Sequence, residues 1–284
     1  MTLQQWFDSG QFLKVNGNNI FYTHSGEGLP VVFIHGFPTS SWDWHKVWQQ
    51  FTPNFHCISF DMLGFGFSDK PLQTYSIAEQ ADIVCAVLAQ LNITSCYIVS
   101  HDYGDTVAQE LLARRLDGSL PFVIRSVSLL NGGLFPETHR PVFTQKLLLS
   151  PLGNSAVRLI KKRSIAKNFM HIFGPETPPS DTEIDQIWAA IIHNNGHLVM
   201  HKLIAYMLER RKNRTRWVGA LQQTDVPLLL INGLADPISG EHLVARFKQL
   251  VPQGEVVELP NIGHYPQLED ADAVSAALYK MLNG

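Results

Sequence analysis

Short apolar runs recur along the chain, and most are followed by a stretch whose apolar residues have helical spacing. Runs of β-branched and aromatic residues are typical of strands buried on both faces of a parallel sheet. We therefore predict strands at 30–34, 55–60, 96–99, 124–130, 226–231 and 255–259. Helices are predicted at 42–51, 76–91, 106–116 and 241–250, with another beginning near residue 270. This alternation predicts an α/β fold with a mostly parallel central sheet flanked by helices.

Two segments depart from the alternation. The runs 12–15 and 20–24 are separated by Asn16-Gly17-Asn18, which predicts an opening β-hairpin. From residue 134 to about 216 the pattern contains helical stretches and no convincing strand; the helical stretches lie around 145–149, 156–168, 181–193 and 198–211. We therefore predict one sheet domain, 1–133 and 216–284, interrupted by a helical cap at 134–215.

The charge distribution follows the same boundaries. Residues 134–216 contain 13 Lys and Arg against 6 Asp and Glu, whereas the whole chain of 284 residues has a net charge of −3. Solvated helix faces and attraction between two lobes explain such an asymmetry. A basic surface that contacts an anionic partner, such as lipid, is the alternative interpretation.

The composition is that of an ordinary globular protein, with 45% apolar and 17% charged residues. No apolar run approaches the roughly 20 residues that a membrane-spanning helix needs. The first residues lack the basic and apolar regions of a signal peptide, and the three cysteines lie in apolar runs. We therefore expect a cytoplasmic protein with reduced, buried thiols.

The sequence Ser100-His101-Asp102-Tyr103-Gly104 joins a predicted strand to a predicted helix. Small residues two positions before and two positions after Asp102 are what a tight strand-to-helix elbow requires, because the backbone there crowds its neighbours. Ser100 is a rival nucleophile, but Ile98 and Asp102 flank it at the same spacing, and neither is small. The pattern therefore favours Asp102 at the apex.

Asp102, Asp236 and His264 each follow a predicted strand, in the order nucleophile, acid, histidine. Ligands bind beyond the carboxyl ends of strands in open α/β sheets. Taken singly, Asp236 could cap a helix and His264 could be structural in its Gly-rich turn. Their joint occurrence favours a catalytic triad.

A carboxylate nucleophile implies a particular mechanism. An ionised Asp102 can attack a saturated carbon without a base and form an alkyl ester. His264, oriented by Asp236, would then activate water to hydrolyse this ester, and the developing oxyanion needs two donors. We expect the backbone N–H groups of Phe37 and Tyr103 to supply them.

These residues resemble the epoxide hydrolase and haloalkane dehalogenase branch of the α/β-hydrolases, in which His-Gly-x-Pro and an Asp elbow recur. More closely, the chain resembles the mesoderm-specific transcript family. The matching stretches are 35–41, 61–71, 100–112, 131–141, 216–221 and 264–270. The resemblance implies a lid-covered hydrolase for an apolar small molecule.

Departures from that branch bear on the substrate. Epoxide hydrolases of this fold use two lid tyrosines, and residues 134–216 contain only Tyr206. The halide-binding positions of dehalogenases are here Tyr103 and Phe37. Epoxide hydrolysis is therefore the leading hypothesis and carbon–halogen hydrolysis the second, while a binding protein with little or no turnover is a third. Candidate substrate contacts are His35, Trp42, Trp188 and Tyr206, with Trp217 or a lid histidine as alternative donors.

Two other signals are given a structural interpretation. His193, His197 and His201 have helical spacing but no accompanying carboxylate or cysteine, so we predict no metal site and no cofactor. The basic run from Arg210 to Arg216 lacks a nucleic-acid motif, and we interpret it as a solvated helix end. No oligomeric state is indicated.

Overall fold

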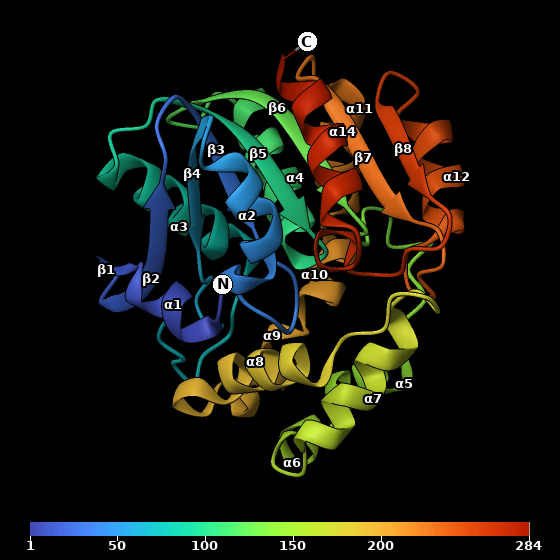
Figure 1. The fold of residues 1–284 in the computed structure, drawn as a ribbon. Helices are drawn as coiled ribbons and strands as arrows, with labels where there is room; N and C mark the ends of the chain where they lie inside the picture. The colour runs from blue at the N-terminus through green and yellow to red at the C-terminus, as the bar shows by residue number, and fades with distance from the viewer. Residues whose placement is uncertain (284) are drawn as a thin grey trace.

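A computed structural model describes residues 1–283, and its centre is an eight-stranded sheet (Figure 1). The strand order is β1-β2-β4-β3-β5-β6-β7-β8. β1 and β2 form an antiparallel hairpin, β2 pairs antiparallel with β4, and the remaining neighbours are parallel. The strands are β1 Gln11–Val15, β2 Asn18–Ser25, β3 Leu29–Ile34, β4 Phe55–Phe60, β5 Ser95–His101, β6 Val123–Leu130, β7 Leu228–Gly233 and β8 Glu255–Leu259.

Helices pack along the sheet and enclose a continuous hydrophobic core. On one side α4 (Tyr103–Leu116) packs between α3 (Ile77–Gln90) and α11 (Arg214–Gln223). On the other side α2 (His45–Phe51) packs against α14 (Ala271–Asn283). The remaining core helices are α1 Leu3–Asp8, α12 Glu241–Leu250 and α13 Pro266–Glu269.

The segment between β6 and β7 is helical throughout its regular structure, and α5 to α9 lie beyond the carboxyl ends of the parallel strands (Figure 1). Its helices are α5 Phe143–Leu149, α6 Gly153–Val157, α7 Lys162–Ile172, α8 Asp181–Ile192, the 3₁₀ helix η2 His193–Val199, α9 Met200–Leu203 and α10 Tyr206–Lys212, followed by α11. The predicted cap boundary at residue 215 falls inside α11, which packs on α4. Within residues 1–283, no helix combines the length and the apolar character needed to cross a bilayer.

A polar cluster fastens α11 to α4. Glu110 accepts hydrogen bonds from Arg216, from Arg114 and from the indole N–H of Trp217, at 2.8–3.1 Å. Arg216 is therefore not part of a freely solvated helix end. The Trp217 N–H bonds to Glu110, not to Asp102.

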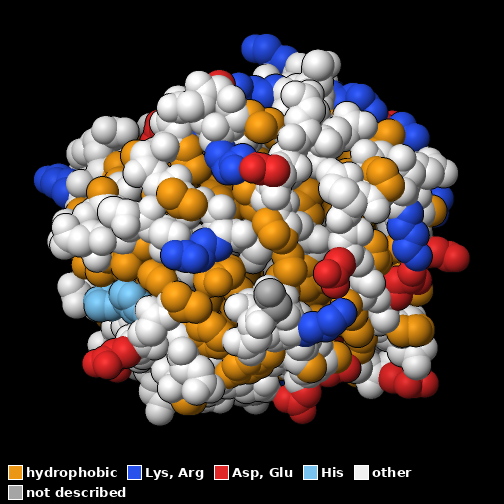
Figure 2. Space-filling model, turned by 90° about the horizontal axis from the view of Figure 1, so that it is seen from above, with side chains coloured by type: hydrophobic (Ala, Val, Ile, Leu, Met, Phe, Trp, Pro, Cys, Tyr) orange, Lys and Arg blue, Asp and Glu red, His pale blue; other side chains and the backbone are white. Residues whose placement is uncertain are grey.

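Figure 2 shows the end of the molecule that lies opposite α5–α9. On this end Lys and Arg lie interspersed with Asp and Glu.

The predicted strands and the opening hairpin are confirmed, but three helical predictions are corrected. The stretch 156–168 is not one helix, because α6 ends at Val157 and α7 begins at Lys162. The stretch 42–51 begins as a 3₁₀ turn, and Ser40 at its N-cap makes no side-chain capping bond. The stretch 198–211 is divided, because α9 ends at Leu203 and α10 begins at Tyr206.

Candidate active site

Asp102 lies at a sharp turn between β5 and α4, with φ 46° and ψ −100°. Positive φ is strained for a residue with a β-carbon, and such strain persists where the surroundings enforce it. Gly104 permits the turn, since a β-carbon there would lie 2.5 Å from the carbonyl oxygen of Ile34. Ser100 lies in β5 and its hydroxyl donates to Asp105 at 2.6 Å. The geometry thus places Asp102, not Ser100, at the apex.

Three groups contact the Asp102 side chain, which is 3% exposed. The backbone N–H of Phe37 donates to Oδ2 at 3.2 Å. The hydroxyl of Tyr206 lies 3.2 Å from Oδ1 and 3.5 Å from Oδ2. The Nη2 atom of Arg210 lies 3.5 Å from Oδ1. The two carboxylate oxygens therefore differ: Oδ2 accepts the backbone N–H, and Oδ1 is the nearer oxygen to the Tyr206 hydroxyl and is the one that Arg210 contacts.

Arg210 was interpreted from the sequence as part of a solvated helix end, and the structure corrects this. Its side chain is 3% exposed. It donates from Nη2 to the Asp102 carbonyl at 2.8 Å and from Nε to Thr106 Oγ1 at 2.7 Å. The guanidinium also lies over the ring of Tyr206, 4.3 Å from its centroid. The signal available in the sequence was the four-residue spacing of Tyr206 and Arg210, which places both on one helix face.

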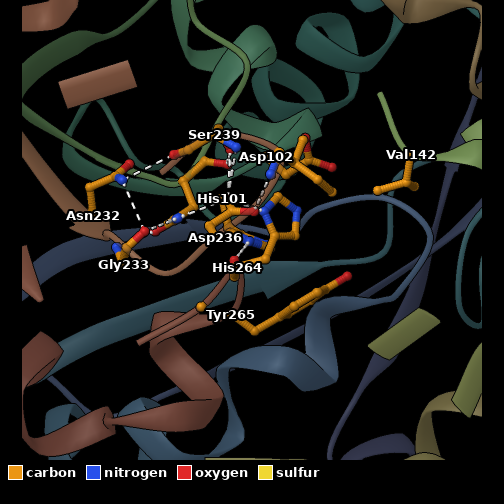
Figure 3. Close-up of polar contacts among 12 residues, drawn as sticks. His101, Asp102, Val142, Asn232, Gly233, Asp236, Ser239, His264 and Tyr265 are labelled. Atoms are coloured by element: carbon orange, nitrogen blue, oxygen red, sulfur yellow. Dashed lines mark hydrogen bonds and ion pairs between the residues drawn. The ribbon is translucent and has the colours of Figure 1, made fainter. Parts of the chain in front are cut away.

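Asp236 and His264 form a second buried pair (Figure 3). The Nδ1–H of His264 donates to Asp236 Oδ2 at 2.7 Å. Asp236 also accepts bonds from the backbone N–H groups of Ile238 and Ser239, from the Ser239 hydroxyl and from the Asn131 amide. In Figure 3 the His264 ring lies between Asp236 and Asp102. The sequence did not identify Asn131 and Ser239 as supports of this pair.

Burial and charge act in opposite directions on these groups. Burial opposes ionisation of Asp102, but Arg210 and His264 hold its pKa below the usual range. Burial would lower the pKa of His264, but Asp236 and then Asp102 raise it to about 9. Beside them, burial lowers the pKa of His101 to about 3, and this neutral ring donates from Nε2 to the His264 carbonyl at 2.7 Å. The resting site is therefore an ionised carboxylate facing a protonated imidazole.

A cavity of about 50 Å³ opens beside His264. Core residues Phe37, Pro38 and Ile238 line one side, and residues of α5, α7 and α9 line the other; the latter include Thr144, Gln145, Leu148, Ile165, Asn168, Phe169, Ile172 and Met200. Most of this lining is apolar, so an apolar substrate fits it better than a charged one.

None of the four candidate substrate contacts lines this cavity. His35 is fully buried, and its two ring nitrogens bond to the Gly36 carbonyl and the Met62 N–H. Trp42 stacks on His45 and donates to the Met1 carbonyl. Trp188 lies near His197. Of the four candidates, Tyr206 alone contacts Asp102.

Within residues 1–283 no group of three or more His, Cys, Asp or Glu side chains is arranged to hold a metal ion. His193 instead packs edge-on against Phe67, with ring centroids 5.0 Å apart. Cys57, Cys85 and Cys96 are free thiols.

The strand order, the β5–α4 elbow and the buried Asp236–His264 pair together are typical of one fold family. Residues 30–271 match the alpha/beta hydrolase fold family, and the chain belongs to that family. The fold predicted from the sequence is thereby confirmed.

The chain is 45% identical to the mesoderm-specific transcript homolog protein of Bos taurus. The alignment is 284 positions long and covers 94% of this chain and 84% of that protein. Among solved structures, it is similar to a loop variant of the haloalkane dehalogenase DbeA from Bradyrhizobium elkanii, with a TM-score of 0.82, 23% identity and 97% of both chains covered. It is also similar to the epoxide hydrolase CorEH, with a TM-score of 0.79, 17% identity and 96% and 98% of the two chains covered. At these identities the two structures support the fold alone.

Proposed function

We propose that the protein is a hydrolase that acts through an alkyl ester on Asp102, with an apolar epoxide as its best substrate class. The observation that carries this proposal is the different surroundings of the two Asp102 oxygens. Oδ1 is nearer the Tyr206 hydroxyl, at 3.2 Å against 3.5 Å for Oδ2, and contacts Arg210, whereas Oδ2 alone accepts the Phe37 N–H. Oδ1 is therefore assigned as the attacking atom and Oδ2 as the ester carbonyl oxygen.

In the first step Oδ1 attacks an epoxide carbon and the carbon–oxygen bond of the ring breaks. The new alkoxide takes a proton from the Tyr206 hydroxyl, which is restored by the proton of His264. Tyr206 is suited to this role because it lies on the lid side of the nucleophile, 3.2 Å from Oδ1. Burial and the Asp102 carboxylate raise the pKa of Tyr206, and the cationic Arg210 over its ring opposes this rise.

In the second step His264 must accept a proton from water. Esterification of Asp102 removes one of the negative charges that raise the pKa of His264, so this pKa falls at the point where a base is needed. Hydroxide then adds to the Asp102 carbonyl carbon. The Phe37 N–H, with the Tyr103 N–H as the expected second donor, stabilises the oxyanion at Oδ2. Collapse releases the diol, and the proton of the new carboxyl group goes to the departing alkoxide.

Under this proposal, residues 134–215 act as a cap that closes the site and supplies Tyr206 and Arg210. The cap also excludes water from the first step, because the lining contributed by α5, α7 and α9 is mostly apolar. The substrate is a small apolar molecule, and no cofactor enters either step.

Replacing Tyr206 with Phe separates epoxide opening from carbon–halogen cleavage. We expect Tyr206→Phe to lower the rate of ester formation from an epoxide by about 10²–10³-fold. This is the effect that removal of one oxyanion-hole donor has on the rate of an enzyme. A halide leaves without a proton, so release from a haloalkane should change far less. Stopped-flow single turnovers with terminal alkyl epoxides and matched bromoalkanes measure both rates.

The matched control is Tyr75→Phe, which removes a buried hydroxyl that donates to the Pro71 carbonyl rather than to Asp102. Equal losses in the Tyr206 and Tyr75 variants would contradict the assignment of Tyr206. Turnover of haloalkanes without turnover of any epoxide would favour the dehalogenase alternative. No turnover across both panels would favour a binding protein.

A further inference from the structure

The outer face of α5, α6 and α7 forms an open apolar groove of about 650 Å³. Its walls include Phe143, Leu152 and Leu159, which are 78%, 65% and 75% exposed. Large apolar side chains gathered at this exposure mark interaction surfaces, because leaving them in water is unfavourable. In Figure 1 these helices project from the body of the molecule, so the groove is accessible to a broad flat surface.

The segment that carries this groove has formal charges of a single sign. Between residues 138 and 175 the sequence contains seven Lys and Arg and no Asp or Glu; the basic residues are Arg140, Lys146, Arg158, Lys161, Lys162, Arg163 and Lys167. All seven are exposed, Lys167 lines the groove, and Lys162 pairs with Asp185 of α8. Exposed apolar side chains on a basic segment are complementary to an anionic lipid surface, where the apolar groups enter the interface and the cations meet the headgroups.

The groove is adjacent to the active-site cavity. Thr144 and Asn168 line both the outer groove and the cavity beside His264. The Thr144 hydroxyl donates to Asn168 Oδ1 at 3.0 Å, and this bond joins α5 to α7 between the two spaces. The inner cavity is small, at about 50 Å³, so a substrate with an alkyl chain needs additional room. Separation of Thr144 from Asn168 would join the cavity to the groove.

We propose that the α5–α7 face docks on anionic phospholipid membranes and that the groove receives the alkyl chain of an amphiphilic substrate, which enters the active site between Thr144 and Asn168. The docking follows from the surface alone. The entry of a substrate chain rests on the proposed function. The two parts are therefore tested separately.

Docking is tested by co-sedimentation of the full chain with vesicles of phosphatidylcholine alone or mixed with phosphatidylserine. We expect binding to the mixed vesicles, falling with added salt, and little binding to phosphatidylcholine. The double variant Lys161→Glu/Arg163→Glu should lower the partition coefficient by about tenfold or more. Leu159→Ser should also lower the partition coefficient, although this variant retains the charges of Lys161 and Arg163. The control Lys280→Glu reverses an exposed charge on α14 and should bind like the wild type.

Equal binding of wild type and double variant, or no binding to either vesicle, would overturn the docking proposal. A concentration-dependent dimer that is abolished by Leu159→Ser, without vesicle binding, would assign the groove to a second copy instead. The same assay with Asp102→Ala separates docking from catalysis, because this variant should bind vesicles although it cannot form the ester.

Chain entry is tested by comparing turnover of a long-chain terminal epoxide in mixed vesicles and in detergent-free buffer. We expect vesicles to raise turnover in the wild type and not in Lys161→Glu/Arg163→Glu. Equal stimulation of both proteins would contradict entry from the membrane-docked face. If neither protein turns over the epoxide while docking is retained, the proposed function fails and the docking surface stands.

Discussion

His264→Gln should convert the enzyme into a trap for its own intermediate. Glutamine retains a side chain of similar reach but cannot accept a proton from water, so ester hydrolysis should slow by about 10²–10⁴-fold, the usual contribution of a general base. Attack by Asp102 does not require that base. Intact-protein mass spectrometry after mixing with an epoxide should therefore show a mass increase equal to one substrate molecule.

The matched control for this trap is the double variant Asp102→Ala/His264→Gln, which lacks the proposed nucleophile and should gain no mass. Peptide mapping of the single variant should place the added mass on the β5–α4 elbow. Added mass on a cysteine or on Ser100, or adduct formation that persists without Asp102, would contradict the assignment of the nucleophile.

Arg210→Met should impair both stability and catalysis. Removing one partner of a buried charge pair costs about 3–5 kcal/mol of unfolding free energy, because the other charge stays buried without compensation. The same loss should raise the pKa of Asp102, which Arg210 holds low. The acid limb of the pH profile of kcat/KM should then move to higher pH.

Two variants separate charge from packing at this position. Arg210→Lys retains the charge but not the paired bonds to the Asp102 carbonyl and Thr106. Its acid limb should therefore lie closer to that of the wild type than the acid limb of Arg210→Met does. Its free energy of unfolding should recover to a smaller extent. Arg211→Met removes the exposed neighbouring charge. It should change the free energy of unfolding by no more than about 0.5 kcal/mol and leave the acid limb of the pH profile in place. An unshifted acid limb in Arg210→Met would contradict its effect on Asp102.

The elbow could be predicted from the sequence because its requirement is local. A positive φ at Asp102 and the close approach of Gly104 to Ile34 follow from a few neighbouring residues and the strand before them. The order of Asp102, Asp236 and His264 could likewise be recognised because each follows a strand, and strand ends converge at one edge of a parallel sheet. Their assignment as a triad stays a prediction.

The environment of Arg210 could not be predicted in this way. It lies in a basic run whose composition is that of a solvated helix end, and only the placement of α10 over β5 and α4 buries it. The same holds for Trp217, whose N–H bonds to Glu110 across two helices. Contacts between segments about 100 residues apart carry no local signal in one sequence.

Helix boundaries between β6 and β7 were the least predictable part of the fold. Apolar periodicity continues through 156–168, but the chain turns between Val157 and Lys162. The gap between the helical stretches predicted at 181–193 and 198–211 is formed by Asn194 and Asn195, which are left-handed, with φ angles of 49° and 62°. Asparagine adopts this conformation more readily than other non-glycine residues, which is a weak signal compared with the packing that selects it.

The most direct test of the ester mechanism is a single turnover of excess wild-type enzyme with an epoxide in ¹⁸O-labelled water. Because water attacks the carbonyl carbon of Asp102, one labelled oxygen should remain in the Asp102 carboxylate, and the diol should carry unlabelled oxygen from the enzyme. Mass spectrometry of the peptide containing Asp102 should thus show a gain of one heavy oxygen. Label found only in the diol, with Asp102 unlabelled after turnover, would contradict the mechanism.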